Sequence, residues 1–70
     1  MKLKKIIKHI NDDTFIGLYL KGSVVYNSQR KNIPNDFINY NVGTIWTGTC
    51  MTGTGHTIPK INIDLKLKEQ

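Results

Sequence analysis

The chain has 70 residues and a formal net charge of +5 at pH 7, from ten basic and five acidic side chains. A chain this short buries only about 60% of the surface that it exposes when unfolded, so we expect one domain over residues 1–70 with a small core. Cys50 is the one cysteine, which excludes a disulfide framework within the chain and favours a reducing, cytoplasmic compartment.

The first ten residues have the spacing of an amphipathic helix. The residues Leu3, Ile6, Ile7 and Ile10 follow the i, i+3, i+4, i+7 pattern, which places them on one face of a helix. We expect a helix over residues 2–10 that docks on a sheet, since it is too short to be stable alone. The basic start is not followed by an uninterrupted apolar run, so neither a secretory signal nor a membrane span is expected.

Two strands joined by a tight turn are expected next. Residues 11–14 are turn formers, and residues 15–20 form an apolar run that includes an aromatic residue, as is typical of a strand. Lys21 and Gly22 then separate this run from residues 23–26, which is the spacing of a hairpin. The polar residues 27–32 indicate a strand end or a loop.

The second half of the chain predicts a short helix and a second pair of strands. Pro34 suits the first position of a helix that runs to about Tyr40. Residues 42–51 have strand composition, with Ile45 and Trp46 on opposite faces, and residues 52–56 form a flexible connection. From residue 61 to residue 68 aliphatic and polar side chains alternate strictly, which predicts a strand with one buried and one solvated face.

The order α-β-β-α-β-β favours an α+β fold. We expect a small antiparallel four-stranded sheet built from two hairpins, with the N-terminal helix on one face and a short second helix. Because so small an interior leaves apolar surface uncovered, a homo-oligomer formed through sheet edges or the uncovered face is also expected.

The order of features resembles small α+β proteins of unknown function that are encoded by phages and prophages of low-G+C bacteria. The matching segments are residues 3–15, 33–45 and 61–65, which together span most of the chain. They hold the Leu-Lys-x-Ile-Ile helix, the Asn-Asp-Asp-Thr turn, the Ile-Pro segment and the closing Ile-x-Ile strand. The resemblance implies a phage origin and brings no site residues with it.

No pattern of catalytic or metal-binding residues stands out. The residue types of a thiol enzyme are present in Cys50, in His9 or His56, and in Asp64. Their spacing is not diagnostic, however, and a lone Cys in a strand is usually a small buried hydrophobic residue. The paired ligand spacings of zinc sites are missing. We therefore expect no enzyme activity, no metal and no cofactor.

Three features are candidates for contacts with a partner or an anion. Basic residues gather on the first helix, including Lys4, Lys5 and Lys8, and on the wet side of the last strand, including Lys60, Lys66 and Lys68. If the two elements are adjacent, they form one basic surface; a solvated face or the Lys usage of an A+T-rich genome explains the same residues without a partner.

The second feature is the Gly/Thr-rich segment 47–57. It offers backbone amides to an anion, with Thr54 and His56 as contacts, or is simply a mobile loop. The third is the set of exposed aromatic residues among Tyr19, Tyr26, Tyr40 and Trp46, which suit base stacking or a protein interface; at least half of them are expected in the core.

Three functions remain open. The leading hypothesis is a non-catalytic phage or prophage protein that binds a host protein in the bacterial cytoplasm, with inhibition of host defence as one such role. The alternatives are a nucleic-acid-binding accessory protein that uses the Lys clusters, and an oligomeric protein that sequesters nucleotides with its Gly/Thr loops.

Overall fold

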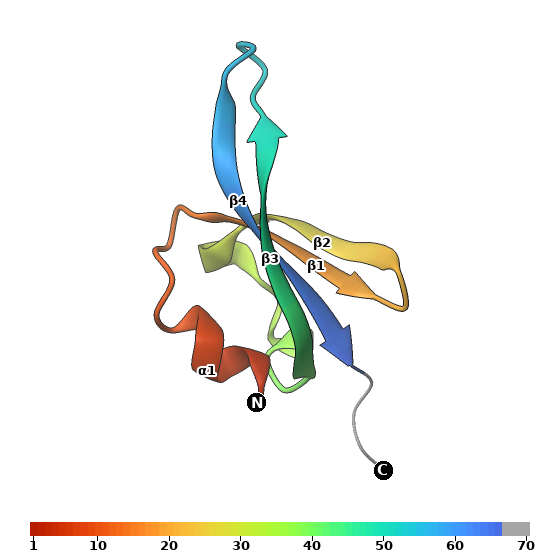
Figure 1. Cartoon of the computed structure of the whole chain (residues 1–70). Coiled ribbons are helices and arrows are strands. Elements are labelled where there is room, and N and C mark those ends of the chain that lie inside the picture. Colours follow the sequence, from red (N-terminus) through yellow and green to blue (C-terminus); the bar gives the residue numbers. More distant parts are fainter. Residues whose placement is uncertain (67–70) are drawn as a thin grey trace.

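A single mixed sheet organises the molecule (Figure 1). The structure is a computed structural model that describes residues 1–66. The elements are α1 (Leu3–Ile7), β1 (Phe15–Leu20), β2 (Ser23–Gln29), two 3-10 turns (Arg30–Asn32 and Asn35–Phe37), β3 (Asn41–Met51) and β4 (Thr57–Lys66). The α+β class is confirmed. Leu67 and Lys68, which the alternating pattern adds to the last strand, lie outside the described residues.

The arrangement of the strands differs from the expected antiparallel sheet. Both hairpins form, but the strand order is β2-β1-β4-β3, and the central pair, β1 and β4, runs parallel. The last strand therefore lies inside the sheet and β3 lies at its edge. β4 carries the aliphatic residues Ile61, Ile63 and Leu65, whereas β3 is rich in Thr and Gly. Placing β4 at the centre puts the more apolar strand where most area is buried.

The apolar ridge of the N-terminal helix, formed by Leu3, Ile6, Ile7 and Ile10, packs on the sheet as predicted. The helix itself is shorter than expected. Leu3 is completely buried, and Ile6, Ile7 and Ile10 pack against the core. After Ile7 the chain continues in tight turns, in which the His9 and Ile10 amides donate to carbonyls three residues earlier at 3.1 and 3.0 Å.

The predicted second helix, residues 34–40, is wrong. This segment forms only the 3-10 turn Asn35–Phe37, because the chain needs it to cross the sheet between β2 and β3 and to pack Phe37 and Tyr40 on the core. Pro34 immediately precedes the turn with φ −62°.

All five buried apolar residues of the described chain lie on one side of the sheet. They are Leu3, Ile16, Leu18, Ile63 and Leu65. The helix and the crossing segment cover this side, and no element of residues 1–66 covers the other side, which we call the open face. The expected alternation of β4 is confirmed for which side chains share a face, but the polar face is not solvated throughout, because Asn62 is buried.

The β3–β4 hairpin extends beyond the other strands as an arm (Figure 1), and the molecule measures 44 × 23 × 18 Å. The β1–β2 turn at Lys21 and Gly22 is confirmed; both residues have positive φ, 54° and 81°, as a two-residue type I′ hairpin requires. Within residues 1–66 no helix is long and apolar enough to cross a membrane.

Arg30 fixes the loop that connects α1 to β1. Its amide donates to the Thr14 carbonyl at 2.8 Å, its Nε donates to the Ile10 carbonyl at 3.1 Å, and its guanidinium pairs with Asp12. The neighbouring Lys31 amide donates to the Asp12 carbonyl at 3.1 Å. Since the loop sets where the helix lies on the sheet, Arg30 connects the two layers.

Replacing Arg30→Lys should lower the free energy of unfolding by about 1–2 kcal/mol, because Lys keeps the charge but cannot bond Ile10 and Asp12 together. Lys31→Ala is the control, since the exposed Lys31–Asp13 pair at 3.4 Å is worth about 0–1 kcal/mol. Urea unfolding followed by circular dichroism measures both; equal losses for the two variants would contradict the role of Arg30.

Candidate functional site

The two groups of candidate lysines lie on opposite sides of the sheet. Lys4, Lys5 and Lys8 belong to the helical layer on the core side. Lys60 and Lys66 are an even number of residues from Asn62 on β4, so their side chains point to the same face of the sheet as Asn62, which is the open face. Consistent with this, Lys60 atoms are among those nearest to a Cβ placed on Gly17. The structure therefore does not bring the two groups together as one basic surface.

Thr54 and His56 lie in the loop at the tip of the arm, and both are exposed. The loop bonds to itself: the Thr52 amide donates to the His56 carbonyl at 2.8 Å, and the Gly55 amide donates to the Thr52 carbonyl at 3.0 Å. The His56 amide donates to Thr52 Oγ1 at 3.3 Å. These amides already have acceptors, so an anion would have to compete with them.

The outer edge of β3 is the most exposed apolar element of the described chain. Ile45, Trp46 and Met51 are 48%, 42% and 71% exposed. Only the start of this edge is paired: Lys2 bridges Asn41, and the Val42 amide donates to the Met1 carbonyl at 2.8 Å. Along the rest of the edge, no strand of residues 1–66 pairs with β3. Residues 43–51 contain no charged residue and no Pro, the features that usually protect an edge from pairing.

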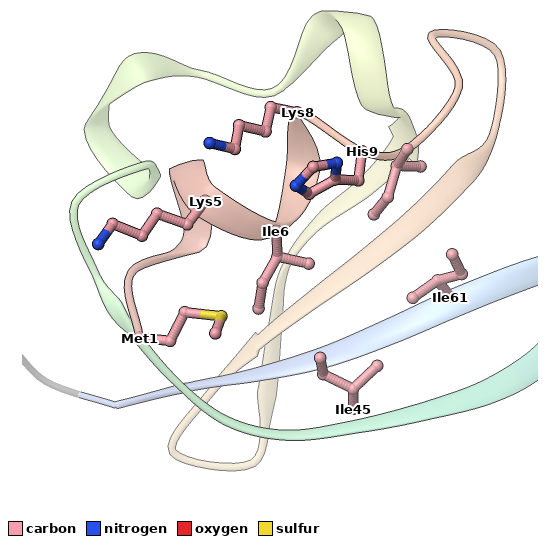
Figure 2. A pocket seen from close by; sticks show the side chains of 8 residues that line it. Met1, Lys5, Ile6, Lys8, His9, Ile45 and Ile61 are labelled. Carbon is pink, nitrogen blue, oxygen red and sulfur yellow. The ribbon is translucent and has the colours of Figure 1, made fainter.

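An apolar groove lies beside this edge, between α1 and the uncovered part of the core side. It has a volume of about 530 Å³. Figure 2 shows Ile45 of β3 and Ile61 of β4 pointing toward Ile6 of α1, with Met1 at one end. We call this hollow the edge groove. Its walls come from two layers: Ile6 of the five-residue helix lies on one side, and Ile45 and Ile61 of the sheet lie on the other.

The border of the edge groove is basic. Lys5, Lys8 and His9 line it together with the apolar floor, and no carboxylate of the described residues lines it. Two of the lysines singled out in the sequence, Lys5 and Lys8, thus belong to one site, whereas Lys4 is exposed elsewhere on the helix.

A second group of side chains lies on the open face. The rings of Tyr19 and Trp46 are 5.4 Å apart at an interplanar angle of 38°. They come from β1 and β3, which flank β4, so the pair crosses over the central strand. Phe15 shares this face with Tyr19 because the two residues are four apart on β1. Tyr26 and Tyr40 pack against the core.

Beneath this aromatic pair the Asn62 amide is enclosed between two glycines. Asn62 is 6% exposed. Its Oδ1 would lie 2.7 Å from a Cβ on Gly17, and its Nδ2 would lie 2.9 Å from a Cβ on Gly48. Oδ1 is buried and has no hydrogen-bond partner among the described residues. The two glycines therefore make room for a polar side chain at the centre of the open face.

Residues 1–66 hold no group of three or more His, Cys, Asp or Glu side chains that could bind a metal. Cys50 is partly buried in the arm opposite Ile58. His56 is at the tip of the arm, whereas His9 lines the edge groove, so the Cys and His residues do not form a common site.

Comparisons with protein-family models, with curated proteins and with solved structures give no match to this chain.

Sequence reasoning missed the edge groove and the central role of Asn62. The signal for the free edge was present, because residues 41–51 form a long strand without charge or Pro. The groove had no such signal, since it depends on how far the helix reaches across the sheet. The pattern Gly17–Asn62–Gly48 becomes visible only once the strands are in register.

Replacing Gly17→Ala should destabilise the fold by about 1–3 kcal/mol, because the added methyl would lie 2.7 Å from Oδ1 of the nearly buried Asn62 amide. Gly53→Ala is the control; a Cβ there meets nothing within 4 Å, so we expect a change within about 0.5 kcal/mol. Both are measured by urea unfolding.

The double variant Gly17→Ala/Asn62→Ala tests the cause. If the Asn62 amide is the obstacle, the double variant loses less stability than the sum of the losses of the two single variants. Additive losses would contradict the proposed overlap.

Proposed function

We propose that this chain is a non-catalytic protein-binding domain that receives an extended segment of a partner along the edge of β3. The observation that carries the proposal is the coincidence of an unprotected edge with an apolar groove. Strand addition uses both: backbone hydrogen bonds give affinity, and pockets for alternate side chains give specificity.

The geometry suits a segment that lies beside residues 43–51. Alternate side chains of an added strand point to the two faces of the sheet. On one face they would enter the edge groove beside Ile45, and on the other they would contact Trp46. Both residues are large, apolar and about half exposed, as is typical of an interaction patch.

The groove also favours a chemical class of partner. Its floor is aliphatic and its border carries Lys5, Lys8 and His9 without a carboxylate. A segment in which apolar residues alternate with Asp or Glu is complementary to this lining. The resemblance to phage and prophage proteins makes a protein of the bacterial host the source that we expect for such a segment.

A second copy of the chain is the other candidate for this edge, in line with the expected homo-oligomer. The absence of charge and Pro along residues 43–51 favours pairing between identical edges as well as pairing with a partner.

Ile45→Lys should abolish binding of peptides to the edge groove. The lysine places a charge on the groove floor and repels the basic border, while the half-exposed position tolerates the change with little loss of stability. Selection of random peptides of about twelve residues against the wild-type chain should enrich sequences that alternate apolar and acidic residues.

Val24→Lys is the matched control, because Val24 is 54% exposed and lies on β2 at the opposite edge. Enriched peptides should bind this variant as they bind the wild type. Failure to enrich any peptide, or binding that survives Ile45→Lys, would refute strand addition at β3.

Sedimentation velocity over a range of concentrations tests pairing between copies. If two β3 edges join, the wild-type chain forms a concentration-dependent dimer that Ile45→Lys converts to a monomer, because two charges then face the shared interface. A wild-type chain that is monomeric throughout would remove self-pairing, and a dimer unaffected by the variant would place it elsewhere.

A further inference from the structure

The open face has a composition that the proposed protein site does not explain. It lies on the opposite side of the sheet from the edge groove, and it combines three aromatic residues with a buried amide and two lysines. These residues are Phe15, Tyr19, Trp46, Asn62, Lys60 and Lys66. No element of residues 1–66 packs on them.

From this combination we infer that the open face binds single-stranded nucleic acid. Aromatic side chains on an exposed sheet are stacking platforms for unpaired bases, and each stacked base contributes regardless of its sequence. Trp46 is 42% exposed, so one ring of the pair has area free for a base. The Tyr19 ring contacts it on the same face, with the ring centroids 5.4 Å apart.

The spacing fits a strand of several nucleotides. Phe15 and Tyr19 are four residues apart on β1, which is about 13 Å along a strand. Lys60 and Lys66 are six residues apart on β4, or about 20 Å, which exceeds the length of a mononucleotide. The face therefore offers separated stacking positions beside separated positive charges, as a polymer with alternating bases and phosphates requires.

The glycines at the centre of the face explain how the bases gain access. Gly17 and Gly48 flank Asn62 on the neighbouring strands, so no side chain of these two positions rises between the aromatic positions. The Lys60 side chain lies across Gly17, with its Cε within 2.7 Å of the Cβ position. A flexible lysine at this place can swing its ammonium and Cε away from Gly17 toward a phosphate.

The Asn62 amide is a second observation that points to a ligand. It is more than nine-tenths buried, and its Oδ1 has no partner among the described residues. Native proteins rarely bury such an acceptor without a role. Movement of Lys60 toward a phosphate would uncover Oδ1 for the amino or imino group of a stacked base.

Asp64 is the one acidic residue of β4 on this face, and its Oδ2 lies beside Gly43 next to the Lys66 side chain. It reduces the positive charge at one end of the face. Affinity should therefore come mainly from stacking, with a shallow salt dependence that reflects about two phosphate contacts.

The experiment uses an oligothymidylate of about twelve residues at low ionic strength, about 20 mM. Trp46 is the sole tryptophan, so its fluorescence should be quenched as the oligonucleotide binds. Anisotropy of the same oligonucleotide carrying a fluorescein label gives the affinity of each variant.

Trp46→Leu should weaken binding about tenfold or more, which corresponds to the loss of one stacked base. Tyr19→Leu is the second variant, and circular dichroism confirms that each remains folded. Lys60→Gln should reduce the slope of log K against log salt by about 0.7. Lys4→Gln is its control, since it makes the same charge change on the opposite side of the sheet and should leave the slope unchanged.

Four results would overturn the inference. They are an absence of binding at low salt, an affinity that Trp46→Leu leaves unchanged, equal effects of Lys60→Gln and Lys4→Gln, and equal binding of a duplex of the same length. Half-saturation by thymidine monophosphate at the same concentration as the oligonucleotide would assign the face to free nucleotides instead. Ile45→Lys should bind the oligonucleotide normally, which separates this face from the edge groove.

Discussion

Packing of the N-terminal aliphatic ridge on one side of the sheet is the interaction on which the rest of the structure depends. Leu3 is completely buried against Ile16, Leu18 and Ile63, and Ile6 and Ile7 of the helix and Ile10 of the turns after it pack on the same core. The described chain has enough non-strand residues to cover one side of the sheet. That limit leaves three surfaces without an internal partner: the open face, the outer edge of β3 and the edge groove between α1 and the sheet.

The three surfaces differ in chemistry, and the difference follows from the strand that each involves. β4 separates aliphatic side chains on the core side from polar ones on the open face. β3 contributes Ile45 to the groove and Trp46 to the open face, because neighbouring residues of a strand point in opposite directions. One edge strand therefore takes part in both proposed sites, while the basic helix residues and the β4 lysines serve different sides. A surface that joins all the lysines is not present in the described chain.

Each proposed site contains a feature that is unfavourable in the isolated chain and that a bound partner would relieve. A long edge without charge or Pro normally carries a risk of aggregation, and a buried acceptor without a partner costs about 1–3 kcal/mol. β4 shows how the chain avoids the first problem elsewhere: Pro59 lies in the arm opposite Thr49, where β1 no longer pairs with β4. The arm is thus protected along the β4 side and unprotected along β3, which agrees with a partner on β3.

The sequence by itself determined the local elements and their faces. The i, i+3, i+4 spacing of the ridge and the Lys21–Gly22 turn depend on interactions between near neighbours, and the structure confirms them. The alternation along β4 sets which side chains share a face, although Asn62 on the polar face is buried. Only the tertiary structure decided that β4 pairs with β1 in parallel, because an alternating pattern specifies a face but not a neighbour. It also reduced the segment after Pro34 to 3-10 turns, since this segment must cross the sheet. The edge groove and the Gly17–Asn62–Gly48 arrangement follow from that strand order, so local patterns could not reveal them.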